Sequence, residues 1–109
     1  MLYLDHAATS PVRPEVLDAM RPFLAGVFGN PSSHHTYGEA AASALDEARA
    51  RVARVLGMRS GDVIFTSGGT ESNNLAVKGI VLAALARGRG HLVVSPIEHE
   101  SILESADYL

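Results

Sequence analysis

A turn of small residues, Ser67-Gly68-Gly69-Thr70, stands between an apolar stretch at 63–66 and a longer apolar stretch from about residue 71 to 86. We expect the first stretch to be a strand and the second a helix. The first N–H groups of a helix lack intrahelical partners, the helix dipole favours an anion there, and glycine lets a ligand approach the backbone. The turn is therefore a candidate phosphate site. Ser67 or Thr70 also fits as a plain N-cap, and both interpretations stay open.

The second candidate is His99, which follows a continuous apolar segment at 91–95 that predicts another strand. Open α/β sheets bind ligands beyond the carboxyl ends of their strands, so we expect His99 and the 67–70 turn to border one crevice. The alternative is that His99 merely begins a helix between Glu98 and Glu100.

Several other chemistries lack the residues that they need. A P-loop requires a Lys followed by Ser or Thr, a dinucleotide loop requires G-x-G-x-x-G, and neither is present. Leu103 stands where a zinc protease motif starting at His99 needs its second histidine, and Phe65 stands where the hydrolase elbow needs its first glycine. The remaining histidines have no metal-ligand spacing, so we expect no metal site: His6, His34, His35 and His91.

The elements that must position these residues indicate an α/β fold. A short helix from Pro14 should end or kink at Pro22, a loop spans 26–38, and a helix over 39–56 is capped by Gly57. The two apolar strands and the helix between them predict a parallel, right-handed βαβ unit, and a final helix covers 100–109. Two strands cannot complete a sheet and the last helix has no stop signal, so we expect the front part of a larger α/β protein.

Composition limits the class of protein further. The chain has 109 residues, 47% of them hydrophobic and 19% charged, which indicates a folded globular chain. A net charge of −3 without a basic run argues against nucleic acid, and zero cysteines exclude disulfides, thiolate metal ligands and a thiol nucleophile. No apolar run approaches the ~20 residues of a membrane span, and no signal peptide is evident, so the cytoplasm is the expected compartment.

Four blocks of sequence carry a resemblance to a known family. In chain order they are LDHAATSP at 4–11, GNPSSHH at 29–35 followed by Gly38, FTSGGTESNN at 65–74, and Glu98-His99. These blocks resemble the N-terminal motifs of the cysteine desulfurases. Those are pyridoxal-phosphate enzymes of the class V aminotransferase group with the fold type I architecture.

The resemblance implies roles for individual residues. Gly69 and Thr70 match the pair that holds the cofactor phosphate through backbone N–H groups and a hydroxyl. His99 matches the histidine that stacks on the pyridine ring and assists proton transfer, so it is the expected catalytic residue. Residues 1–38 would be an N-terminal segment that borders the active site, and residues 39–109 the start of the large, cofactor-binding domain.

The chain also departs from what such an enzyme needs. Pyridoxal-phosphate chemistry uses a Schiff-base lysine and a carboxylate on the pyridine nitrogen, and desulfuration adds a nucleophilic cysteine. Lys78 is the only lysine, and it falls inside the predicted helix at a position that does not match the Schiff-base lysine, so it is read as a solvated helix residue. We therefore expect these residues to be inactive on their own.

The expected function is the N-terminal part of a desulfurase that converts L-cysteine to L-alanine and an enzyme persulfide for iron-sulfur cluster or thio-cofactor synthesis. The implied partners are L-cysteine, a sulfur-acceptor or scaffold protein, and a second subunit in a homodimer. Two alternatives stay open. One is another class V enzyme, such as a selenocysteine lyase or an aminotransferase, and the other is a truncated, non-catalytic binding or dimerising chain.

Overall fold

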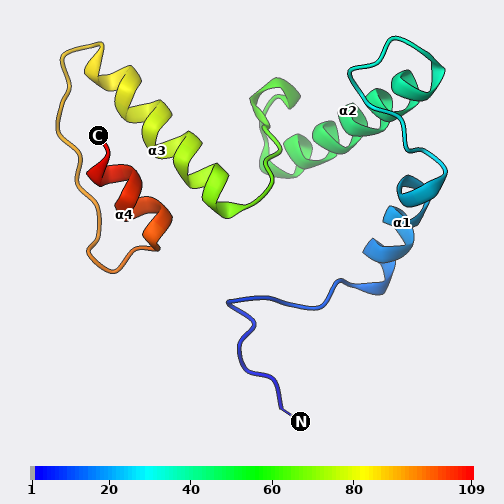
Figure 1. Ribbon diagram of the computed structural model, residues 1–109, viewed down its shortest axis with the longest axis horizontal. Coiled ribbons are helices and arrows are strands. Elements are labelled where there is room, and N and C mark those ends of the chain that lie inside the picture. The colour runs from blue at the N-terminus through cyan, green and yellow to red at the C-terminus, as the bar shows by residue number, and fades with distance from the viewer. Residues whose placement is uncertain (1) are drawn as a thin grey trace. The chain divides into compact units, whose positions relative to one another are not determined.

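The computed structural model describes residues 2–109, which Figure 1 shows as helices joined by irregular segments. The helices are α1 (Pro14–Ala25), α2 (Thr36–Leu56), α3 (Gly69–Leu85) and α4 (Glu100–Asp107), with a short 3₁₀ helix, η1 (Ser60–Asp62), between α2 and α3. Contacts divide the chain into two compact units, one up to Val63 and the other from Ile64 to Leu109. The expected division into domains 1–38 and 39–109 refers to a larger protein and stays a prediction.

Helix α1 begins at Pro14, where the missing N–H of proline is not needed. Of the two effects expected of Pro22, an end of the helix is wrong, because α1 continues to Ala25, and a kink stays a prediction. Downstream of the proline, the N–H of Gly26 donates to the carbonyl of Pro22 at 3.0 Å. A proline inside a helix removes its own backbone donor but leaves its carbonyl available, and α1 tolerates that loss.

Helix α2 begins earlier than the predicted Glu39 because His35 caps it. The Nδ1 atom of His35 accepts the N–H of Gly38 at 3.2 Å, which satisfies one of the first helical donors. The predicted loop over 26–38 is therefore shorter than expected, and within it the N–H of Ser32 donates to Oδ1 of Asn30 at 2.9 Å. At the other end Gly57 has φ 67°, and the predicted left-handed cap is confirmed.

The second unit consists mainly of α3 and α4, which pack against each other. Helix α3 begins at Gly69, two residues before the predicted start, and it is followed by Gly88 with φ 73° in the segment that was expected to stop it. Helix α4 begins at Glu100 as expected and ends at Asp107. Both helices start at the same end of the pair, so they run in nearly the same direction (Figure 1).

The predicted strands at 63–66 and 91–95 are not observed. Both segments lack regular secondary structure, and no β-strand occurs anywhere in residues 2–109. A strand exists only when its N–H and C=O groups alternate in a ladder with a neighbouring backbone, and these two segments do not form a ladder with each other. The predicted βαβ unit is therefore wrong for this chain, because apolar side chains indicate suitability for a sheet but do not supply the neighbour.

Few side chains are buried in either unit. Among residues 2–109 the buried hydrophobic core consists of Ala53, at 2% exposure, and the buried polar residues are Ser101 and Ser105 in α4. Many large apolar side chains are exposed instead, including Ile97 at 91% and Val93 at 80%. None of the helices in the described part of the chain is long and apolar enough to span a membrane.

Candidate functional site

The turn at 67–70 leads directly into α3. Gly68 is the N-cap residue, Gly69 and Thr70 are the first two residues of the helix, and both are exposed. The backbone bond from the N–H of Ser72 to the carbonyl of Gly68, at 3.1 Å, is an early i to i−4 bond of α3. The N–H groups of Gly69 and Thr70 precede that bond and lie at the positive end of the helix dipole. The alternative that Ser67 or Thr70 is the N-cap is wrong.

Side-chain hydrogen bonds hold the shape of this turn. The N–H and Oγ of Ser67 both donate to Oε2 of Glu71, at 2.7 and 2.6 Å. The hydroxyl oxygens of Thr66 and Ser72 lie 2.6 Å apart. The Ser67 hydroxyl, and after it the Ser67 backbone N–H, lowers the pKa of the Glu71 carboxyl below its ordinary value of 4.5. The turn thus enters α3 in a shape that these contacts define.

His99 is the N-cap residue of α4, so the prediction that this histidine begins a helix is confirmed. Its Nδ1 atom accepts the backbone N–H of Ser101 at 3.1 Å and lies 2.9 Å from the Ser101 hydroxyl. Both contacts use the same ring nitrogen. Capping therefore occupies Nδ1 alone, and the structure shows no hydrogen bond at Nε2 within residues 2–109. A capping role and a role toward a ligand are compatible.

A hydrogen bond between helices connects the two predicted parts of the site. The side-chain amide of Asn73 donates from Nδ2 to Oγ of Ser101 at 2.9 Å. Asn73 follows Gly69 by four residues and Thr70 by three, so it lies on the same face of α3 as those two residues. The start of α3 and the histidine at the start of α4 are therefore joined through Asn73 and Ser101. Neither of these linking residues was identified from the sequence.

Lys78, the single lysine, does not point to this site. It lies eight residues beyond Thr70, a rise of about 12 Å along the helix axis, and its Nζ atom lies 4.6 Å from the ring centroid of Tyr108. A cation over an aromatic ring is a favourable structural contact. Lys78 is thus half-buried beside Tyr108 rather than fully solvated, and the expectation that it is not the Schiff-base lysine stays a prediction.

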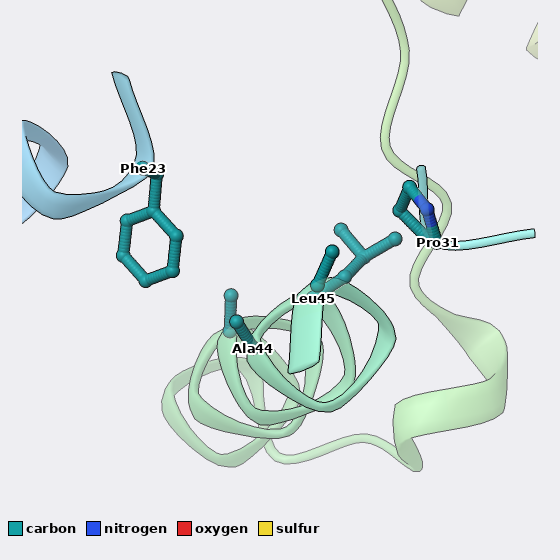
Figure 2. A pocket seen from close by; sticks show the side chains of 6 residues that line it. Phe23, Pro31, Ala44 and Leu45 are labelled. Atoms are coloured by element: carbon teal, nitrogen blue, oxygen red, sulfur yellow. The ribbon is translucent and has the colours of Figure 1, made fainter. Parts of the chain in front are cut away.

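Neither a metal centre nor a second phosphate site is evident elsewhere in the described part of the chain. Within residues 2–109 no group of three or more His, Cys, Asp or Glu residues is arranged to hold a metal ion. The first unit contains a hollow of about 310 Å³ between α1 and α2, shown in Figure 2, with an apolar lining. The lining residues are Phe23, Pro31, Ala41, Ala44, Leu45 and Ala48. Without a charged group, this hollow does not suit a phosphate.

Comparison with known proteins gives one consistent family. The class-V aminotransferase family matches residues 2–109. The chain is 49% identical over 108 residues to cysteine desulfurase IscS of Dictyoglomus turgidum, covering 99% of this chain and 27% of that protein. It is 45% identical over 109 residues to cysteine desulfurase IscS 1 of Archaeoglobus fulgidus, covering 100% of this chain and 28% of that protein. The chain is thus homologous to enzymes but spans little more than a quarter of their length.

Two solved structures share its backbone path. One is SspA in complex with cysteine, with a TM-score of 0.84 and 40% identity over 97% of this chain and 30% of the SspA chain. The other is a NifS-like protein, with a TM-score of 0.79 and 36% identity over 93% of this chain and 28% of the other. The chain therefore corresponds to a fragment of the fold type I enzyme structure.

Proposed function

The chain belongs to the class V aminotransferase family, and from this membership we propose that it is the N-terminal part of a pyridoxal-phosphate-dependent cysteine desulfurase. The proposed reaction converts L-cysteine to L-alanine and leaves the sulfur as an enzyme persulfide. One structural observation supports roles for individual residues. The exposed N-terminus of α3, at Gly69 and Thr70, is joined to His99 by the Asn73–Ser101 hydrogen bond.

The donor set at the start of α3 suits a phosphate. Backbone N–H groups at a helix N-terminus bind anions, and the Thr70 hydroxyl adds a donor from the second residue of the helix. We assign Gly69 and Thr70 to the cofactor phosphate and His99 to its ring. When bound, the cofactor supplies an electron sink for carbanion chemistry at the substrate.

Residues 1–109 do not contain all the reacting groups. Lys78 lies about 12 Å along α3 from Thr70, and the chain has no cysteine. The covalent lysine, the carboxylate for the pyridine nitrogen and the persulfide-forming cysteine would belong to other parts of the full enzyme. The role of this part would be to bind the phosphate and to position His99.

The partners follow from the same proposal. L-cysteine is the proposed substrate, and the related SspA structure is a complex with cysteine. A sulfur acceptor or scaffold protein would receive the persulfide sulfur, and a homodimer is the proposed assembly of the full enzyme. The cytoplasm stays a prediction, since the relatives include a mitochondrial enzyme of Arthroderma benhamiae.

Replacing Gly69 by proline tests the phosphate assignment. Proline is tolerated at the first helical position, so Gly69→Pro removes one N–H donor and leaves α3 intact. Thr70→Val removes the hydroxyl at similar size. We expect each change to weaken binding of pyridoxal 5′-phosphate about 10- to 150-fold, as measured by equilibrium dialysis. This corresponds to the loss of one charge-assisted hydrogen bond of about 1.5 to 3 kcal/mol.

Two controls accompany this measurement. Thr70→Ser keeps a hydroxyl and should bind nearly as the unchanged chain does. Pyridoxal without the phosphate should bind weakly and should not respond to Gly69→Pro. Equal binding of pyridoxal and pyridoxal 5′-phosphate would contradict the proposal.

A further inference from the structure

The hydrogen bonds of His99 define which ring nitrogen carries its proton. The backbone N–H of Ser101 can only donate, and it points to Nδ1 of His99 at 3.1 Å. Nδ1 must therefore be the acceptor and have no proton. In a neutral imidazole the single ring proton is then on Nε2.

The hydroxyl of Ser101 reinforces the same tautomer. The Asn73 amide donates from Nδ2 to Oγ of Ser101 at 2.9 Å, which occupies Oγ as an acceptor. The hydroxyl proton is then available for Nδ1 of His99, 2.9 Å away. Ser101 is 8% exposed, so water competes little for these groups. The direction of donation runs from Asn73 to Ser101 to His99.

We propose that Asn73 and Ser101 are positioning residues that hold His99 as the Nε2–H tautomer, with Nε2–H presented as a hydrogen-bond donor. This inference rests on the proposed function in one respect, namely that Nε2 faces the ligand. It also limits the chemistry of His99 in this arrangement. The neutral ring can donate at Nε2, whereas its acceptor nitrogen is already engaged at the start of α4.

The tautomer can be measured without any cofactor. Long-range ¹H–¹⁵N correlation spectra of the ¹⁵N-labelled chain, recorded near pH 9 where an imidazole is neutral, distinguish a protonated ring nitrogen from an unprotonated one. We expect Nε2 of His99 to be the protonated nitrogen. Asn73→Asp should reverse the donation, because a carboxylate accepts the Ser101 hydroxyl proton and turns Oγ into an acceptor for Nδ1–H.

The expected change is a fall in the ratio of Nε2–H to Nδ1–H. The loss of one net hydrogen bond corresponds to a fall of about fivefold in Asn73→Asp, and Ser101→Ala should lower the ratio in the same direction. Ser105→Ala is the matched control. Ser105 is also buried in α4 and donates to the carbonyl of Ser101 at 2.7 Å, but it is outside the path from Asn73 to His99. Its ratio should equal that of the unchanged chain.

Two results would overturn the proposal. One is a dominant Nδ1–H tautomer in the unchanged chain, and the other is an equal ratio in Asn73→Asp, Ser101→Ala and Ser105→Ala. Should Ser101→Ala fail to fold, Asn73→Ala tests the same path from α3. A different result would count against the proposed function alone. If the unchanged chain binds pyridoxal and pyridoxal 5′-phosphate equally while His99 keeps its proton on Nε2, the positioning role of Asn73 and Ser101 still holds.

Discussion

At the residue scale, two histidines, His35 and His99, each accept a backbone hydrogen bond through Nδ1 at the start of a helix. His35 accepts the N–H of Gly38 at 3.2 Å, and His99 accepts that of Ser101 at 3.1 Å. In each case the ring replaces the Ser, Thr, Asp or Asn that usually caps a helix. The difference lies in the surroundings, because the hydroxyl of Ser101 adds a second contact to Nδ1 of His99. Nδ1 of His99 therefore has two hydrogen-bonding neighbours, whereas the second contact of the His35 ring is edge-on to Tyr37, at 6.4 Å between ring centroids.

The hydrogen bonds between Ser67 and Glu71 should depend on pH. The hydrogen bonds from Ser67 lower its pKa in the folded chain below the ordinary value of 4.5. These bonds therefore contribute fully above the unfolded pKa and are lost as the pH falls through the lowered folded pKa. We expect ¹³C NMR to show Glu71 titrating below 4.5, and Ser67→Ala should raise that midpoint.

The control for this titration is Thr66→Ser, which keeps a hydroxyl beside Ser72 and leaves Ser67 unchanged. Its Glu71 midpoint should stay where it is in the unchanged chain. A midpoint at or above 4.5 in the unchanged chain would show that the Ser67–Glu71 contact does not persist in solution.

At the scale of the elements, Gly38 determines how the 26–35 loop meets α2. Gly38 is buried, and a Cβ added there would overlap the carbonyl oxygen of Ser33. Gly79, inside α3, has open space around it and no positive φ. Substitution by alanine should therefore change the stability of the chain in opposite directions at these two glycines.

Gly38→Ala should destabilise the first unit by about 1 to 3 kcal/mol, since the backbone must shift to accept the Cβ. Gly79→Ala should stabilise α3 by about 0.5 to 1 kcal/mol, because alanine loses less backbone entropy in a helix. Urea denaturation of the associated chain, followed by circular dichroism at one fixed protein concentration for all variants, measures both changes. Equal effects of the two substitutions would mean that the loop does not approach Gly38 as closely as the structure shows.

At the scale of the whole molecule, the main feature is the large number of exposed apolar side chains. Ala53 is the buried hydrophobic residue among those described, whereas Val55, Val93 and Ile97 are 86%, 80% and 91% exposed. Ordering a residue costs about 1.5 kcal/mol of conformational entropy, which burial of apolar surface must offset. So little burial cannot offset that cost within one chain.

We therefore expect the 109-residue chain to associate in solution. Sedimentation velocity over a range of concentrations should show species larger than a monomer of 11.5 kDa. The double change Val93→Lys and Ile97→Lys should reduce association, whereas Arg87→Lys, which alters no apolar group, should leave it unchanged. An ideal monomer with a cooperative unfolding transition would refute this expectation.

Local sequence signals by themselves determined much of the helical structure and the place of the site residues along the chain. Pro14 begins α1 and Gly57 caps α2 as predicted, because capping and backbone preferences act over only a few residues. Helix α3 was predicted as well, but it begins two residues earlier than expected, at Gly69. The predicted resemblance to the cysteine desulfurases was also based on short local blocks, and the comparisons confirm it. Such features need no knowledge of distant parts of the chain.

Tertiary structure alone decided which groups meet and whether extended segments become strands. Asn73 and Ser101 are 28 residues apart, and their hydrogen bond depends on how α4 lies along α3. The segments at 63–66 and 91–95 have the apolar character of strands but do not pair with each other. Side-chain patterns indicate what a segment can do, whereas a ladder or a contact between helices also requires a partner at hydrogen-bond distance.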